Sequence, residues 1–132
     1  MNIQKSMQAL FGSACLAYSL AYIYDIDNRD NIKGLTLDVV KGWEKGYIDD
    51  DAFVSKPIQY INGVLSGAVT SYSKVKITSL NDLPNKGLYA VQYAYGNTSH
   101  FVVCKKEEIV FDSWEGSSCV KYGKPISYRS IV

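Results

Sequence analysis

Three residues in this chain of 132 residues have the types needed for nucleophilic catalysis: Cys15, His100 and Asp112. A thiolate can attack a carbonyl carbon, and an imidazole beside it takes the thiol proton and later returns a proton to the leaving group. A carboxylate that accepts a hydrogen bond from the second ring nitrogen fixes the tautomer and the direction of the imidazole. Because His100 is the only histidine in the sequence, only this residue can take the central position.

The sequence around Cys15 predicts a helix that carries the thiol at its start. Residues 14–24 are apolar on every face, which is typical of a helix that is buried on all sides. Gly12 and Ser13 favour a turn directly before it, so Cys15 falls in the first helical turn. There the helix dipole stabilises a thiolate, and free backbone N–H groups can bind an oxyanion. The alternative is a buried cysteine that packs as a small hydrophobic side chain.

His100 is expected at the start of a strand. It follows the turn residues 96–99 and precedes Phe101-Val102-Val103, which are typical of a strand. At such a junction the sheet holds a side chain rigidly while the loop leaves it accessible. The alternative interpretation is an ordinary hydrogen-bonded histidine with no catalytic role.

Asp112 lies in residues 109–114, a segment that reads as the next strand although strand interiors disfavour aspartate. If residues 100–106 and 107–114 pair as a hairpin, Asp112 returns to the end of the hairpin where His100 lies. A register shifted by one residue would place it on the opposite face. Alternatively, Asp112 ends the strand and begins a turn toward Gly116.

Further candidate side chains lie close to these three in the sequence. Gln8, seven residues before Cys15, is the candidate donor of an amide N–H to an oxyanion, and a solvent-exposed glutamine is the alternative. Ser99 and Trp114 are candidate substrate-binding residues, and the alternative for Trp114 is packing in the core.

Composition indicates one domain with no polyelectrolyte partner. The net charge is +1 and no basic stripe is present, so nucleic acid is not an expected partner. The single histidine and the scattered cysteines lack metal-ligand spacing, so no metal or other cofactor is expected. Of the three cysteines, Cys104 is expected in the core and Cys119, in a serine-rich loop, is expected to be exposed.

The expected location is cytoplasmic. An odd number of cysteines fits a reduced compartment, and no stretch is apolar and long enough for a confident transmembrane helix, so no membrane association is expected. The alternative is export, because Lys5 followed by the apolar residues 9–21 could act as a secretion signal.

The order of elements predicts an α+β domain over residues 1–132, with a helical half (1–70) followed by an antiparallel sheet half (71–132). After the helix at residues 14–24, Thr36 is the expected N-cap of a second helix that ends before Gly46. Pro57 is expected to begin a third helix, whose buried stripe is Ile58, Ile61, Leu65 and Ala68. The expected strands are 75–77, 88–95, 101–105, 109–114 and a closing pair, 120–122 with 126–131.

Several of these segments resemble papain-like cysteine peptidases. Gly12-Ser13-Ala14-Cys15 is similar to the nucleophile segment of that superfamily, in which a glutamine lies upstream of the cysteine. Residues 99–103 followed by Val110-Phe111-Asp112 most resemble the bacteriocin-leader-peptidase branch, whose third catalytic residue is Asp rather than Asn. A looser resemblance, through residues 46–54 and 121–129, is to small uncharacterised papain-like domains of phages and spirochaetes.

The resemblance implies a papain-like fold, in which a central nucleophile helix packs on an antiparallel sheet. It also implies a bacterial or phage thiol protease or related hydrolase that cleaves an amide or isopeptide bond of a peptide or protein through a thioester acyl-enzyme. Cys15, His100 and Asp112 would form its catalytic triad. Gln8 lies one residue further from the cysteine than that family's spacing leads us to expect.

Two alternatives to this function stay open. The small size of the chain and its 11 tyrosines also fit a papain-like scaffold that binds a partner without catalysis. A peptidoglycan amidase or peptidase of the same superfamily is a further alternative, and that function would require export. The sequence does not indicate the oligomeric state.

Overall fold

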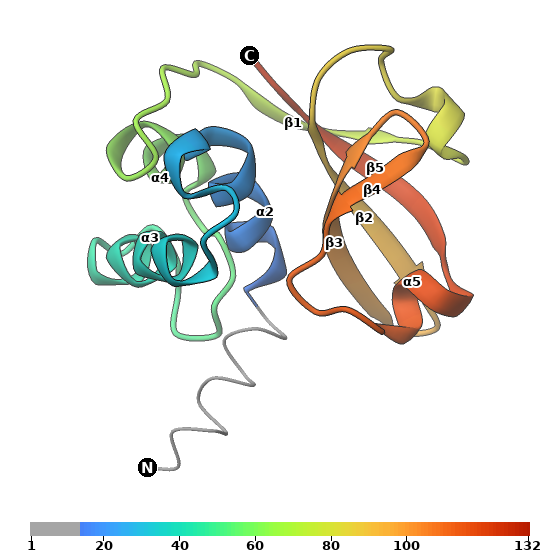
Figure 1. The fold of residues 1–132 in the computed structure, drawn as a ribbon, viewed down its shortest axis with the longest axis horizontal. Coiled ribbons are helices and arrows are strands. Elements are labelled where there is room, and N and C mark those ends of the chain that lie inside the picture. The colour runs from blue at the N-terminus through green and yellow to red at the C-terminus, as the bar shows by residue number, and fades with distance from the viewer. Residues whose placement is uncertain (1–13) are drawn as a thin grey trace, which may run out of the picture.

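The structure is a computed structural model that describes residues 14–132, so Gln8 and the segment before Ala14 lie outside the described residues. This part of the chain is an α+β fold, as the order of elements predicts (Figure 1). The helical elements come first: α2 (Cys15–Tyr24), η1 (Ile26–Asn28), α3 (Ile32–Glu44) and α4 (Pro57–Gly63). The sheet half contains β1 (Tyr72–Lys76), η2 (Leu80–Asp82), β2 (Tyr89–Tyr95), β3 (Thr98–Lys105), β4 (Glu108–Phe111), α5 (Ser118–Tyr122) and β5 (Lys124–Ile131).

The five strands form one antiparallel sheet in the order β1-β5-β2-β3-β4. Figure 1 shows α2 between the other helices and the sheet, and α2 contacts β2, β3, α3 and α4. One hydrophobic core lies around α2, and a second lies between the sheet, the η2 segment and α5. In the described part of the chain, no helix is long and apolar enough to cross a membrane.

Most of helix α2 is enclosed, but the predicted burial on all sides holds for only part of it, because Leu16, Tyr22, Ile23 and Tyr24 are half-buried. Ala17, Tyr18 and Leu20 are fully buried. The hydroxyl groups at this helix have partners: Tyr60 Oη donates to the Ala17 carbonyl at 3.1 Å, and Tyr18 Oη shares a hydrogen bond with Thr36 Oγ1 at 2.8 Å. Burial of the aromatic rings therefore leaves no unsatisfied hydroxyl at these two positions.

The predicted start of the second helix was wrong. Helix α3 begins at Ile32, and the side chain of Asn31 accepts the N–H of Gly34 as its N-cap. Thr36 lies inside the helix because its hydroxyl donates to the Ile32 carbonyl at 2.7 Å and also meets Tyr18. A threonine satisfied in this way does not need to cap a helix.

The third helix begins at Pro57, as predicted, but it ends at Gly63. Ile61 and Leu65 are buried, whereas Ala68 lies beyond the helix and is exposed, so the predicted stripe was too long. In the sheet half, β1 begins earlier than predicted, at Tyr72, and Ile77 lies outside it.

The largest error concerns residues 120–122, which form part of helix α5 and not a strand. The Ser117 hydroxyl accepts the N–H of Cys119 and caps this helix. Helical geometry turns Cys119 into the second core, where it is 4% exposed, so its predicted exposure was also wrong. Strand β5 consequently pairs with β1 and β2, and the predicted closing pair does not form.

A pair of carboxyl groups joins the end of α2 to α3. Asp25 is the C-cap of α2, and its side chain shares a hydrogen bond with Asp38 of α3. Asp38 is 7% exposed, and its Oδ2 has no hydrogen-bond partner within the described residues. Burial first, and then the Asp25 carboxyl, raise the pKa of Asp38 to about 7. The bond from Asp38, and then that from Asn28, lower the pKa of Asp25.

We expect the raised pKa of Asp38 to make the fold less stable as the pH rises. The stability that protonated Asp38 contributes is fully present below pH 3.8 and is lost as the pH rises through about 7. The asparagine of Asp38→Asn does not titrate. As the pH rises from 3.8 to about 7, the unfolding free energy of this variant should therefore increase by about 1–3 kcal/mol relative to wild type. Urea unfolding across this pH range measures the difference, with exposed Asp27→Asn as the control. Parallel pH profiles for wild type and Asp38→Asn would contradict the expectation.

Candidate functional site

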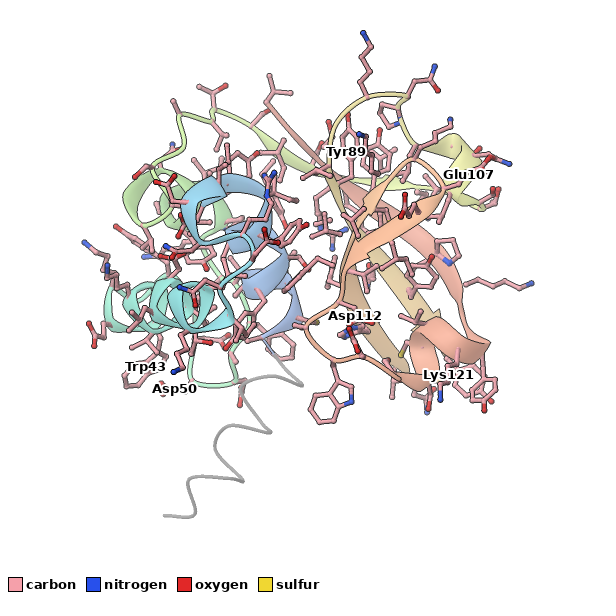
Figure 2. All side chains as sticks on the ribbon, viewed as in Figure 1. Trp43, Asp50, Tyr89, Glu107, Asp112 and Lys121 are labelled. Carbon is pink, nitrogen blue, oxygen red and sulfur yellow. The ribbon has the colours of Figure 1, made fainter. Side chains whose placement is uncertain are left out.

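The structure brings His100 and Asp112 into direct contact. His100 Nε2 lies 2.6 Å from Asp112 Oδ1, and the two side chains are 5% and 11% exposed. The β3–β4 hairpin positions them, because Val103 pairs with Phe111 and the chain leaves the sheet at the next residue. Asp112, labelled in Figure 2, lies in the loop that follows β4. The hairpin and its return to His100 are therefore as predicted.

Two local details of the prediction were wrong. His100 is the third residue of β3 and does not precede the strand, because pairing with β2 extends to Thr98. Asp112 lies after β4 and not inside it, in agreement with the alternative that it ends a strand. Asp112 Oδ1 also accepts the N–H of Trp114 at 2.9 Å, and this local bond turns the chain away from the sheet.

Cys15 joins this pair from the helical half. It is the first residue of α2 and is 7% exposed. The N–H of Phe101, the residue after His100, donates to Cys15 Sγ at 3.4 Å, so the start of the helix rests directly on β3. Cys15 is also close enough to His100 to raise the pKa of its imidazole. Because Nε2 is bound to Asp112, Nδ1 is the ring nitrogen left for a contact with the thiol.

The charge on the imidazole follows from these neighbours. Burial alone lowers the pKa of His100, but the hydrogen bonds and negative charges of Asp112 and Cys15 outweigh it and raise the pKa to about 9. With its pKa raised in this way, the imidazole is protonated near neutral pH. No side chain of the described residues caps the first turn of α2, which begins at Cys15.

An open hollow of about 380 Å³ adjoins His100. The predicted substrate-binding residues Ser99 and Trp114 both line it, and Trp114 is 41% exposed and is not part of the core. The rest of the wall is Thr98, Gly116, Ser117, Ser118 and Cys119. Sequence reasoning missed Thr98, whose hydroxyl meets Cys119 Sγ at 3.2 Å. The run of small residues Gly116-Ser117-Ser118 was the signal for the remainder of this wall.

Cys104 is fully buried in the second core, as predicted. Gln8, the candidate oxyanion donor, lies outside the described residues. Between residues 14 and 132, no group of three or more His, Cys, Asp or Glu side chains is arranged to hold a metal ion.

Comparison of the chain with models of protein families, with curated proteins and with solved structures found no match in any of the three.

The charge of His100 can be tested directly because it is the only histidine in the chain. We expect its ring protons to titrate in an NMR experiment well above pH 6.5, toward about 9. Cys15→Ala and Asp112→Asn should each lower the midpoint, since each changes a group that raises the pKa of His100. Cys104→Ala, in the second core, is the control and should leave it unchanged. A wild-type midpoint at or below 6.5 would contradict the ion pair.

The same shift has a consequence for stability. The contribution of protonated His100 to folding is fully present below pH 6.5 and is lost as the pH rises through about 9. The unfolding free energy should therefore fall by up to about 3 kcal/mol over this range. Asp112→Asn, which retains an acceptor oxygen but has no charge, should reduce this fall in urea unfolding experiments. An undiminished fall would show that it arises elsewhere.

Proposed function

We propose that this chain is a papain-like cysteine hydrolase that cleaves an amide or isopeptide bond in a peptide or protein. The observation that carries the proposal is the convergence of three residues from distant parts of the sequence. Cys15 at the start of a buried helix meets His100 on β3, and His100 is bound to Asp112 at 2.6 Å. Nucleophile, acid–base and orienting group are thus connected in the order that the chemistry requires.

In the first half of the reaction, the Cys15 thiolate attacks the carbonyl carbon. A C–S bond forms, and the π electrons of the carbonyl move to its oxygen. Protonated His100 then gives its Nδ1 proton to the leaving nitrogen as the C–N bond breaks, which leaves a thioester on Cys15. Asp112 stays ionised and holds the Nε2–H, so the ring keeps its direction throughout.

In the second half, water attacks the thioester carbon. His100 Nδ1 takes a proton from that water, and collapse of the tetrahedral intermediate breaks the C–S bond. The carboxylic acid leaves, and the thiolate–imidazolium pair is restored. The uncapped N–H groups of α2, with that of Cys15 first, are the proposed oxyanion donors, and Gln8 remains the proposed side-chain donor.

We assign the hollow beside His100 to the leaving group. Its lining includes His100, which delivers the proton to the leaving nitrogen, and does not include Cys15. The exposed Ser99 can form hydrogen bonds with the main chain of a peptide substrate. The exposed indole of Trp114 offers a flat surface for contact with the same substrate.

The first experiment is the pH dependence of iodoacetamide alkylation, followed for each cysteine by peptide mass spectrometry. Near pH 6, Cys15 should react faster than the other two cysteines. At that pH an appreciable fraction of thiolate exists only if a nearby cation stabilises it. His100→Ala should slow this reaction about tenfold or more. Cys104 and Cys119, both buried in the second core, are internal references in the same sample. Alkylation of Cys15 that is no faster than that of Cys119, and indifferent to His100, would favour a partner-binding scaffold.

Turnover provides the second test. In a screen of internally quenched peptide substrates, Cys15→Ala and His100→Ala should each abolish cleavage and leave the circular dichroism spectrum unchanged. Asp112→Asn should retain part of the activity because its side chain can still accept the Nε2–H. Cys104→Ala is the matched control for loss of a thiol away from the site. Cleavage that survives in Cys15→Ala would rule out the mechanism.

A further inference from the structure

A second surface feature lies on the helical half, at the end of α3. Trp43 is 52% exposed, yet its ring is held in place because Nε1 donates to Asp50 Oδ1 at 3.0 Å. Figure 2 shows Trp43 and Asp50 next to each other at the outer edge of the helical half, whereas Asp112 lies on the sheet half. The indole is therefore fixed at the surface, and it is not part of the candidate catalytic site.

Two hollows adjoin this indole, and we call them together the Trp43 notch. The smaller, of about 160 Å³, has an apolar floor formed by Val39, Val40, Ile48 and Ala52. The larger and more open one is about 500 Å³ and is lined by Trp43, Glu44, Gly46, Ile48, Asp49 and Asp50. Asp49 and Asp50 line both hollows, so carboxylates border the apolar floor as well as the open side.

The loop that carries these carboxylates is tied to itself and to α3. Asp49 Oδ1 accepts the N–H groups of Asp51 and Phe53, both at 3.0 Å, and Ile48 forms an isolated β-bridge with Val54. The Tyr47 and Ile48 N–H groups donate to the Gly42 carbonyl of α3. The notch is consequently formed without rearrangement of the loop, which lowers the entropy cost of binding.

This combination of groups matches one kind of side chain. An aliphatic stem fits the apolar floor of the smaller hollow. A cation placed over the indole gains a cation–π contact. The carboxylates of Glu44, Asp49 and Asp50 supply the opposite charge. A neutral apolar side chain could contact the apolar floor, but it would desolvate the carboxylates without supplying a charge or a hydrogen-bond donor in return. A planar guanidinium can stack on the ring and also bind a carboxylate, which an ammonium does less well.

We propose that the Trp43 notch binds an arginine side chain of a partner polypeptide, with lysine as a weaker ligand. The stem of the side chain lies over Val40 and Ala52, and the guanidinium lies against the Trp43 ring, within reach of Asp50 and Glu44. This binding needs no chemistry at Cys15, so it can hold whether or not the proposed hydrolase activity does.

The test is an NMR titration of the full-length protein with acetyl-Ala-Arg-Ala-amide. The Trp43 indole N–H should shift in a saturable way, and the indole N–H of Trp114 reports separately on any binding of the peptide in the hollow beside His100. The citrulline peptide has nearly the same shape but no charge, and it should bind about tenfold more weakly. The lysine peptide should lie between the two, and the affinity of the arginine peptide should fall as salt is added.

Matched variants separate this site from general attraction by negative charge. Asp50→Asn keeps an oxygen that can accept the indole N–H but removes a charge that lines both hollows, and it should weaken arginine binding about fivefold or more. Asp51→Asn removes the same charge from an exposed neighbour that lines neither hollow, and it should change the affinity less than twofold. Equal effects of the two variants, or equal binding of arginine and citrulline, would overturn the proposal.

Discussion

The constraint on which the rest of the structure depends is the burial of most of α2 between the other helices and the sheet. A helix with no polar face is stable only when other elements cover it completely. Here α3 and α4 cover it from one direction, and β2 and β3 from the other. The same packing places Cys15, at the start of the helix, against the backbone of Phe101, so the position of the thiol is a consequence of how the core forms.

Each end of α2 holds a buried titratable group, and its charge is set differently at the two ends. At its start, burial lowers the pKa of His100, but the interactions of the imidazole with Asp112 and Cys15 outweigh burial and raise it. At its end, burial and the Asp25 carboxyl outweigh the charge of Lys41 and raise the pKa of Asp38, so the more buried carboxyl retains a proton instead. Burial is thus compensated by a counter-charge at one end and by protonation at the other. Protonated His100 and protonated Asp38 both favour the fold on the acidic side of neutrality.

Agreement between sequence and structure is best where one local pattern acts alone. The β3–β4 hairpin follows from two strand segments and a charged turn, and it brings Asp112 to His100. It is poorest where a tertiary contact competes with a local preference. Thr36 looks like a helix cap but serves Tyr18 and an earlier carbonyl, so α3 begins at Ile32. Residues 120–122 have strand-like side chains, but the Ser117 cap and the burial of Cys119 favour a helix.

The sequence by itself determined the α+β order, the buried helix behind Cys15, and the candidate triad, because these depend on residue types and on short-range periodicity. Only the tertiary structure decided that the thiol faces His100, that Asp112 follows its strand, and that Ser99 and Trp114 line one hollow. It also formed the Trp43 notch, in which the end of α3 and the loop after it meet. Each of these depends on distances between residues far apart in the chain or on the path of a loop, and such distances are set when the whole core packs.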